Sequence, residues 1–348
     1  MHMSDALVSP AVAASMWGAT AGASVVAARA LARQPDDRRV PLMGVLGAFV
    51  FAAQMVNFSI PGTGSSGHLV GGLLLAILLG PSAALLVMAS VLTVQALFFG
   101  DGGVLALGCN VFNLGVLTSF VAYPLVFVPL AGTRPTRGRL AVATILASVV
   151  AFQLGSLGVV VETVLSGRAS ISPGAFLVLM QPIHLVIGIV EGLITTLLVL
   201  FVRDARPELV LGGLDATASR PSLRRLATAI LLAAAVVAGV LSWFASSAPD
   251  GLEWSLARAS SRAAPRTAAH QGLPARPPDP TAVQPAETRA GPESQERLPD
   301  AVARTWPKVA ASDSLSGLAG AAMTLALGGL LAAALRLFRR SSRPPSSP

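Results

Sequence analysis

Nine apolar stretches, most of them long enough to approach or cross the roughly 30 Å hydrocarbon core of a bilayer, follow one another along the chain. Proline, glycine and charged residues separate these stretches, which lie at residues 11–31, 41–58, 68–79, 81–99, 107–130, 140–164, 174–202, 226–247 and 315–338. Only 12% of the 348 residues are charged and 53% are hydrophobic, so the chain has too few charges to cover a soluble surface. The sequence therefore predicts an all-α integral membrane protein and excludes a soluble enzyme.

The basic residues predict the orientation of these stretches, because short cytoplasmic loops of membrane proteins are enriched in lysine and arginine. With the N-terminus outside, the basic residues of the inner segments are Arg29, Arg33, Arg38, Arg39, Arg134, Arg137, Arg139, Arg203, Arg206, Arg220, Arg224, Arg225, Arg336, Arg339, Arg340 and Arg343. The short outer loops between the first eight stretches hold only Arg168. This distribution predicts an extracytoplasmic N-terminus and a cytoplasmic C-terminus, and it requires that all nine stretches cross.

The third stretch, residues 68–79, is short for a complete span, because a helix rises only about 1.5 Å per residue. Gly80-Pro81 ends it. We expect either a partial helix or an apolar run that is shared with the fourth stretch. Half-helices within a membrane usually line a site.

Charge and cysteine content exclude other classes of function. The formal charge is +8, but the chain has a single lysine and no basic stripe interleaved with aromatic residues, so nucleic acid is not an expected partner. One cysteine, Cys109, excludes an intrachain disulfide, a thiolate zinc site and an iron–sulfur cluster. Any metal site must therefore use nitrogen or oxygen ligands.

Three polar segments flank the apolar stretches. The first five residues lack the basic region of a signal peptide, so we expect them to remain in the mature protein. Residues 259–304 mix Pro, Ala, Arg, Glu and Gln without apolar periodicity, which predicts a disordered outer loop. The tail at residues 339–348 is also expected to be disordered.

Two histidines, His2 and His68, fall on the predicted outer side. The amine of Met1, the backbone amide of His2 and its imidazole are three successive nitrogens that can chelate one ion, and His68 would supply a fourth. Four nitrogens in a plane suit Ni(II) or Cu(II), whereas zinc prefers a tetrahedron. The alternative interpretation of His2 is a solvated terminal residue.

Glycines surround the second of these histidines. The run at residues 61–67 allows a tight backbone fold, and Gly71-Gly72 allow close helix packing behind it, although a flexible turn would have the same composition. The sequence G-x-x-x-x-G-K-[ST] is absent from the chain, so we expect no ATP site in it. Active transport would require a partner that hydrolyses ATP.

Polar side chains within apolar spans are costly and are therefore candidates for function. They are Gln54, Asn57, Gln95, Asn110, Asn113, Gln153, Glu162, His184 and Glu191. Asn110 and Asn113 share one helical face and serve either interhelical packing or support of a metal-binding histidine. His184 and Glu191 lie two turns apart and form either a proton or ion relay or a buried polar contact. Glu191 is predicted toward the inner half, far from the outer site, where it would couple to a partner rather than bind metal.

The sequence resembles the CbiM/NikM family, the substrate-binding membrane subunits of energy-coupling factor transporters for cobalt and nickel. The resemblance rests on MHMSD with Leu7 and Pro10, PGTGSSGHLVGG at 61–72, QALFFGDGG at 95–103, LGCNVFN at 107–113 and HLVIGIVEGLIT at 184–195. It implies a seven-helix S component with its N-terminus outside, in the plasma (inner) membrane of a prokaryote. It also implies that the Met1 amine, the His2 amide and imidazole, and His68 hold the metal. Ala6 departs from the glycine that members often have.

The C-terminal part resembles a fused accessory subunit. The run Pro249-Asp250-Gly251-Leu252-Glu253 is similar to the PDGLE signature of the two-helix N component. The implied organisation is a metal-binding core at residues 1–203, a cytoplasmic linker at 204–225 and a NikN-like segment at 226–338. The last unit contains the outer loop at 249–313 and adds two transmembrane helices to the core. Fusion would keep the helper at high effective concentration.

These features predict a metal-capture subunit for Ni(II) or Co(II), with nickel slightly favoured, rather than an enzyme. The metal is the transported substrate, and no resident cofactor is expected. The expected partners are a transmembrane coupling (T) protein and two ATPase subunits. One alternative is a self-sufficient secondary permease that uses His184 and Glu191. A membrane metalloenzyme would need further metal ligands, which the sequence does not offer.

Overall fold

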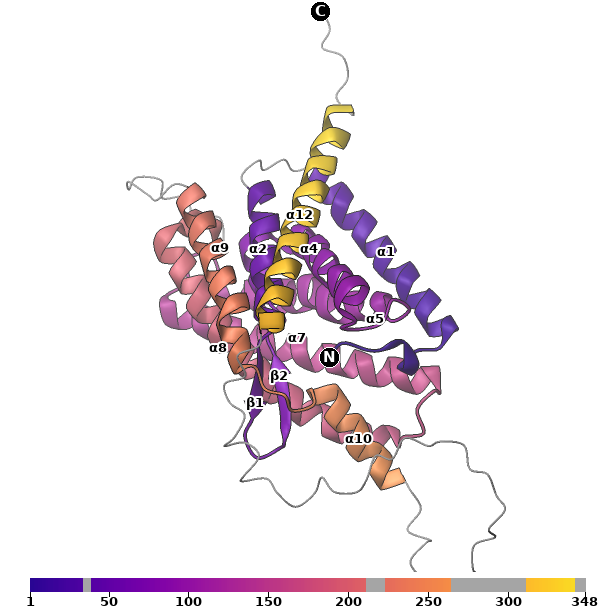
Figure 1. Cartoon of the computed structure of the whole chain (residues 1–348). Helices are drawn as coiled ribbons and strands as arrows, with labels where there is room; N and C mark the ends of the chain where they lie inside the picture. The colour runs from indigo at the N-terminus through magenta and orange to yellow at the C-terminus, as the bar shows by residue number, and fades with distance from the viewer. Residues whose placement is uncertain (34–38, 211–222, 264–310, 342–348) are drawn as a thin grey trace, which may run out of the picture.

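The computed structural model describes residues 1–33, 39–210, 223–263 and 311–341. Figure 1 shows long helices gathered around a central bundle, with a two-stranded hairpin at one end. The helices are α1 (Pro10–Arg33), α2 (Arg39–Gln54), α3 (Gly72–Leu79), α4 (Pro81–Val94), α5 (Leu107–Val111), α6 (Val128–Ala131), α7 (Arg137–Ser166), α8 (Pro173–Ala205), α9 (Leu223–Gly239), α10 (Gly251–Ala263) and α12 (Ala311–Ser341). Short 3₁₀ turns lie at Asp5–Leu7, Pro207–Leu209 and Leu241–Phe244.

Two of the spans contain π-helical stretches. Helix α4 continues through the π-helical residues Gln95–Phe99. Helices α5 and α6 are the ends of one long span, and π-helical turns at Phe112–Val116 and Thr118–Phe127 connect them. Pro124 lies inside this span, where it removes a backbone donor and disfavours regular α-helical bonding.

Six described helical segments are long and apolar enough to cross a membrane, which confirms a helical, multi-pass membrane protein. They are Pro10–Arg33, Pro81–Phe99, Leu107–Ala131, Arg137–Ser166, Pro173–Ala205 and Ser314–Leu331, and the shorter apolar segment Pro41–Gln54 adds to them. The expected seven-plus-two arrangement and the orientation in the membrane stay predictions. The domain boundaries also stay predictions. Residues 211–222 of the linker predicted at 204–225, and most of the outer loop, lie outside the described residues.

The third apolar stretch is only partly helical. Helix α3 has eight residues, all of them buried, so it rises about 12 Å. It does not begin at His68, because that residue belongs to a strand and Gly71 separates the two elements with a φ of 74°. Only glycine adopts this left-handed conformation without cost. The partial-helix interpretation therefore describes this segment.

A short antiparallel hairpin, which the all-α prediction omits, carries His68. Strand β1 (Asn57–Ile60) pairs with β2 (Ser65–His68) so that Asn57 lies opposite His68. A segment from the C-terminal unit runs alongside. The amide of Ser66 donates to the carbonyl of Pro249 at 2.8 Å, and the amide of Ser246 donates to the carbonyl of Asn57 at 2.8 Å. The hairpin thus joins the N-terminal and C-terminal parts of the chain.

Helix α10 corrects the prediction of disorder from residue 259 onward, because the helix continues to Ala263. The helix starts within the PDGLE run. The amide of Glu253 donates to Asp250 Oδ1 at 2.8 Å, and the amide of Asp250 donates to Glu253 Oε2 at 3.3 Å. This reciprocal capping satisfies backbone donors that the first turn of a helix leaves free. Helix α12 likewise continues through residues 339–341, where the tail was expected to be disordered. The remainder of the expected loop, and the tail from residue 342, lie outside the described residues.

Helix α8 has two different faces. Val178, Leu197 and Phe201 are 65%, 68% and 58% exposed, which suits contact with lipid. His184 and Glu191 are 0% and 2% exposed and lie on the inward face. The helix therefore brings two ionisable side chains into the interior beside the hairpin.

Candidate metal-binding site at the amino terminus

The amino terminus is folded into the protein beside the hairpin histidine. The rings of His2 and His68 stack with centroids 5.0 Å apart and an interplanar angle of 12°. Both side chains are buried, and Met1 is buried with them. The structure thus brings together the three residues that the sequence singles out as ligands, and His2 is not a solvated terminal residue.

His68 is oriented so that one ring nitrogen is available. Its Nδ1 lies 3.0 Å from the carbonyl oxygen of Leu69 and, as the protonated nitrogen, donates a hydrogen bond to it. This tautomer leaves the lone pair of Nε2 free for a metal. The pKa of His68 is lowered to about 4. Burial is the main cause, and the positive charges of the Met1 amine and His2 add to it. The imidazole is therefore neutral near pH 7, as a metal ligand must be.

His2 is held by a carboxylate. Its Nδ1 lies 3.0 Å from Oδ1 of Asp101, in the loop that follows the fourth span. Burial opposes ionisation of Asp101, but the charge of His2 and its hydrogen bond outweigh this effect and hold the pKa of Asp101 below its usual range. No described residue hydrogen-bonds to the buried Nε2 of His2.

The amine of Met1 forms an ion pair with the C-terminal unit. The amine nitrogen lies 3.4 Å from Oδ2 of Asp250. Burial opposes ionisation of Asp250, but the positive amine outweighs it and lowers the pKa of this carboxyl to about 2. Asp250 is therefore an anion next to the first nitrogen of the predicted chelate.

Asn110 holds the residue that follows the chelate. Its Oδ1 accepts a hydrogen bond from the amide of Met3 at 2.8 Å, and its Nδ2 donates to the carbonyl of Met3 at 3.1 Å. Gly103 donates to the same carbonyl at 3.0 Å. Asn110 thus bonds to the backbone of Met3, next to His2, rather than to a neighbouring helix or to a histidine ring. Asn113 has a different partner, because its Nδ2 donates to Glu162 at 2.8 Å and so links two helices.

Glu191 fixes the backbone just beyond His68. Its Oε2 accepts from the amide of Val70 and its Oε1 from the amide of Gly71, both at 2.8 Å. The prediction that Glu191 lies far from the site is therefore wrong. The reason is that α3 is a half-helix, so the segment leading into it reaches the depth of Glu191. Glu191 does not share a hydrogen bond with His184 but binds the hairpin segment instead.

Two glutamines extend this polar layer. Gln54 Nε2 donates to the carbonyl of Val70 at 2.7 Å, and Gln95 Nε2 donates to Gln54 Oε1 at 2.6 Å. These amides hold the opposite side of the segment that Glu191 binds. Backbone polar groups at this depth must be satisfied inside the protein, because lipid offers no partners.

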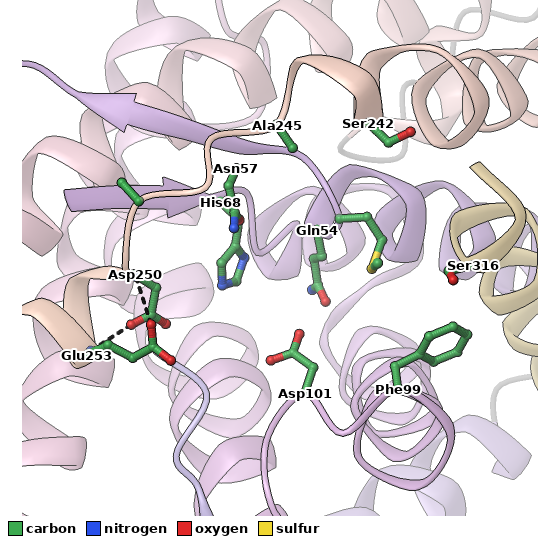
Figure 2. A pocket seen from close by; sticks show the side chains of 12 residues that line it. Gln54, Asn57, His68, Phe99, Asp101, Ser242, Ala245, Asp250, Glu253 and Ser316 are labelled. Atoms are coloured by element: carbon green, nitrogen blue, oxygen red, sulfur yellow. Dashed lines mark hydrogen bonds between the residues drawn. The ribbon is translucent and has the colours of Figure 1, made fainter. Parts of the chain in front are cut away.

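A cavity of about 480 Å³ opens next to His68. Figure 2 shows His68, Asp101 and Asp250 around it, with Gln54 at its far side and Glu253 beside Asp250. Polar and anionic groups line the region between the hairpin and the C-terminal unit. Such a lining favours passage of a hydrated cation.

The two carboxylates of the site, Asp101 and Asp250, were not predicted as site residues. Asp101 lies in the Gly-Asp-Gly-Gly run between two spans, and Asp250 is the acidic residue of the PDGLE run. Their positions in recognisable motifs were the available signal. Their contacts join segments far apart in the sequence, so spacing alone could not reveal the partners.

The site differs from a conventional side-chain metal centre. The described parts of the chain hold no group of three or more His, Cys, Asp or Glu side chains arranged for a metal ion. The predicted set uses only two side chains and takes its other two nitrogens from the Met1 amine and the His2 amide.

Comparisons with known proteins agree with these features. The family described as "Cobalt uptake substrate-specific transmembrane region" matches residues 2–209, and the PDGLE domain matches residues 224–337. A metal transport protein of Haloquadratum walsbyi is 39% identical over 210 residues, which cover 60% of this chain and 93% of that protein. The cobalt transport protein CbiM of Geobacter sulfurreducens is 31% identical, covering 69% and 72% of the two chains.

A fused relative and a solved structure were also found. The fused nickel transport protein NikMN of Rhodobacter capsulatus is 39% identical over 122 residues, 35% of each chain. The crystal structure of a transition metal transporter superposes with a TM-score of 0.48 and 29% identity, covering 59% of this chain and 93% of that one.

Proposed function

Because the chain belongs to the CbiM/NikM family of cobalt and nickel transport membrane proteins, we propose that it captures Ni(II) or Co(II) at its amino terminus. The family assignment includes a C-terminal NikN-like segment. The relatives are metal transport proteins rather than enzymes. The proposed role is to bind the ion and deliver it, without chemical conversion.

The proposed ligands are the Met1 amine, the His2 amide nitrogen, Nδ1 of His2 and Nε2 of His68. Nδ1 of His2 can close a six-membered ring with the metal and the amide nitrogen of the same residue. Nε2 of His2 is too far from that amide to do so. The observation that carries the proposal is the stack of His2 on His68, with the amine of Met1 buried beside it.

Metal binding at these nitrogens requires exchange of protons and partners. Asp101 now accepts from Nδ1 of His2, and Asp250 pairs with the amine. A divalent ion would displace the protons of the amine, the amide and Nδ1, and the two carboxylates would then balance the charge of the chelate. Their depressed pKa values keep them anionic for this purpose.

The proposed partners are a transmembrane coupling protein and two ATPase subunits, which together form an energy-coupling factor transporter of the ABC type. The proposal follows the family and the absence of the P-loop sequence from the chain. The metal delivered serves cobalamin biosynthesis or nickel enzymes. The chain would lie in the plasma membrane with its N-terminus outside.

Nickel is slightly favoured over cobalt as the substrate. Four nitrogens in one plane suit Ni(II). The fused relative from Rhodobacter capsulatus is named a nickel transport protein, although the Geobacter relative is named for cobalt. A secondary permease using His184 and Glu191 has less support, because both oxygens of Glu191 already accept backbone hydrogen bonds.

Titration of purified protein with Ni(II) and Co(II) tests the proposal. One preparation keeps Met1 as its first residue, and a second carries Gly-Ser-Gly upstream of it. We expect one tightly bound ion in the first preparation and its loss in the second, because the extension converts the amine into an amide. Tight binding that is indifferent to the extension would overturn the assignment of the ligands.

A further inference from the structure

A second histidine lies close to the amino-terminal site and is not used by it. His184 is fully buried in α8, and its Nδ1 donates to the carbonyl of Met180 at 2.8 Å. No residue in the described part of the chain hydrogen-bonds to its Nε2. This tautomer places an unused lone pair in the interior, the arrangement that metal-binding histidines adopt.

The unused nitrogen belongs to a residue that lines a small cavity. The cavity measures about 10 Å³ and is bounded by Met1, His68, His184 and Asp250, with apolar side chains closing it. A cavity of this size is about the smallest that can hold one water molecule. The four residues therefore border a space for at most one small occupant.

The glycine of the PDGLE run keeps this space open. A Cβ at Gly251 would lie 3.2 Å from Cε1 and 3.5 Å from Nε2 of His184, and 2.7 Å from Cγ2 of Ile183. A larger residue would contact the edge of the imidazole that carries the free nitrogen. The C-terminal unit thus approaches His184 by backbone alone and sets the Asp250 carboxylate at the mouth of the same cavity.

We propose that Nε2 of His184 and the carboxylate of Asp250 form an inner, weaker binding position for the divalent ion, directly behind the amino-terminal chelate. The inference rests on the proposed capture of metal at the amino terminus. Imidazole nitrogen and carboxylate oxygen both suit first-row divalent ions. Two protein ligands make a weak site, which is what an ion in transit requires.

Asp250 connects the two positions. Its carboxylate now pairs with the Met1 amine, so an ion that occupies the amine releases Asp250 from this contact. The same carboxylate can then turn to the ion as it leaves the chelate. Ligands are exchanged one at a time along this route, and the ion is never without a protein ligand.

The extended protein provides the test, because Gly-Ser-Gly upstream of Met1 removes the tight site. Equilibrium dialysis against Ni(II) and Co(II), with metal analysis, measures what remains. We expect one weaker equivalent in the extended chain and at least about a tenfold loss of its affinity in His184→Gln and in Asp250→Asn. Thr196→Val is the matched control, since Thr196 is buried on the same helix and its hydroxyl donates to the carbonyl of Gly192 within that helix.

Two results would overturn the inference. An extended chain that binds no weaker equivalent shows that the cavity holds no metal ion, and a weaker equivalent whose affinity survives both substitutions places the ion elsewhere. Asp250→Asn keeps the test meaningful if His184→Gln fails to fold, because Asp250 is partly exposed. Tight binding that survives the extension is a different outcome, since it contradicts the proposed ligands rather than the inner position.

Discussion

The carboxylate of Asp250 lies 3.4 Å from the amine of Met1, although the two residues are 249 positions apart. The C-terminal unit therefore reaches the first nitrogen of the proposed chelate within the same chain. A contact made in one polypeptide does not depend on the concentration of a separate subunit.

His2→Ala and His68→Ala should each abolish high-affinity metal binding while the protein stays folded. Each change removes one of four nitrogens, and neither histidine contributes to the large apolar core. Metal titration and thermal unfolding of the purified variants measure the two effects. His270→Ala, a histidine outside the described residues, is the control and should bind like the parent. Retained affinity in either site variant would reject that ligand.

Asn110→Ala should weaken Ni(II) binding by about 10–100-fold, because the backbone of Met3 loses both of its bonds to this side chain. Asn113→Ala is the matched variant. It removes the hydrogen bond to Glu162, so it should lower thermal stability and leave the affinity near that of the parent. Equal losses of affinity in both variants would argue that Asn110 acts only through general packing.

Glu191→Gln should lower the unfolding free energy by about 1–3 kcal/mol and also weaken metal binding. The glutamine has one acceptor oxygen, so one of the amides of Val70 and Gly71 loses its partner, and His68 loses its fixed position. Thermal unfolding and metal titration give the two readouts. Normal binding with lost transport would instead favour the earlier interpretation that Glu191 couples to a partner.

Gly251→Ala should loosen the contact between α10 and α8, because the added Cβ would meet Ile183 at 2.7 Å. Overpacking of this kind costs about 1–3 kcal/mol. Limited proteolysis between residues 245 and 263 should become faster. Gly174→Ala, where nothing lies within 4 Å of the added atom, should leave the proteolysis rate unchanged. A rate unaffected by Gly251→Ala would show that the close approach is not needed.

Acid should destabilise the hairpin through His68. The pKa of this residue falls from 6.5 to about 4 in the folded protein, so the unfolded chain binds the proton more readily. The free energy of unfolding therefore does not depend on the protonation of His68 above about pH 6.5. It decreases as the pH falls from 6.5 toward 4, by at most roughly 3 kcal/mol. Thermal unfolding of the parent should therefore depend more steeply on pH in this window than that of His68→Gln. Parallel profiles would contradict the effect of burial on this histidine.

Hydrophobicity was enough to predict the six described segments that are long and apolar enough to span a membrane, and ligand chemistry singled out Met1, His2 and His68. The apolar runs have the length of bilayer spans, and successive nitrogens at a chain terminus form a chelate whatever the fold around them. The position of Glu191 was not predictable, because hydropathy assigns it to a helix but does not give the depth at which a half-helix begins. Helix α10 was missed because its composition is polar and its start depends on the capping pair Asp250 and Glu253.

The backbone bonds between Ser66 and Pro249, and between Asn57 and Ser246, attach the segment before α10 to both strands of the hairpin, with a single bridge between Ser66 and Asp250. The amide of Ser66 on β2 thereby has a main-chain partner from the C-terminal unit. Recognition through main-chain atoms tolerates change in most side chains. Selection would then fall on Asp250 and Gly251, the positions where a side chain, or the lack of one, faces the site.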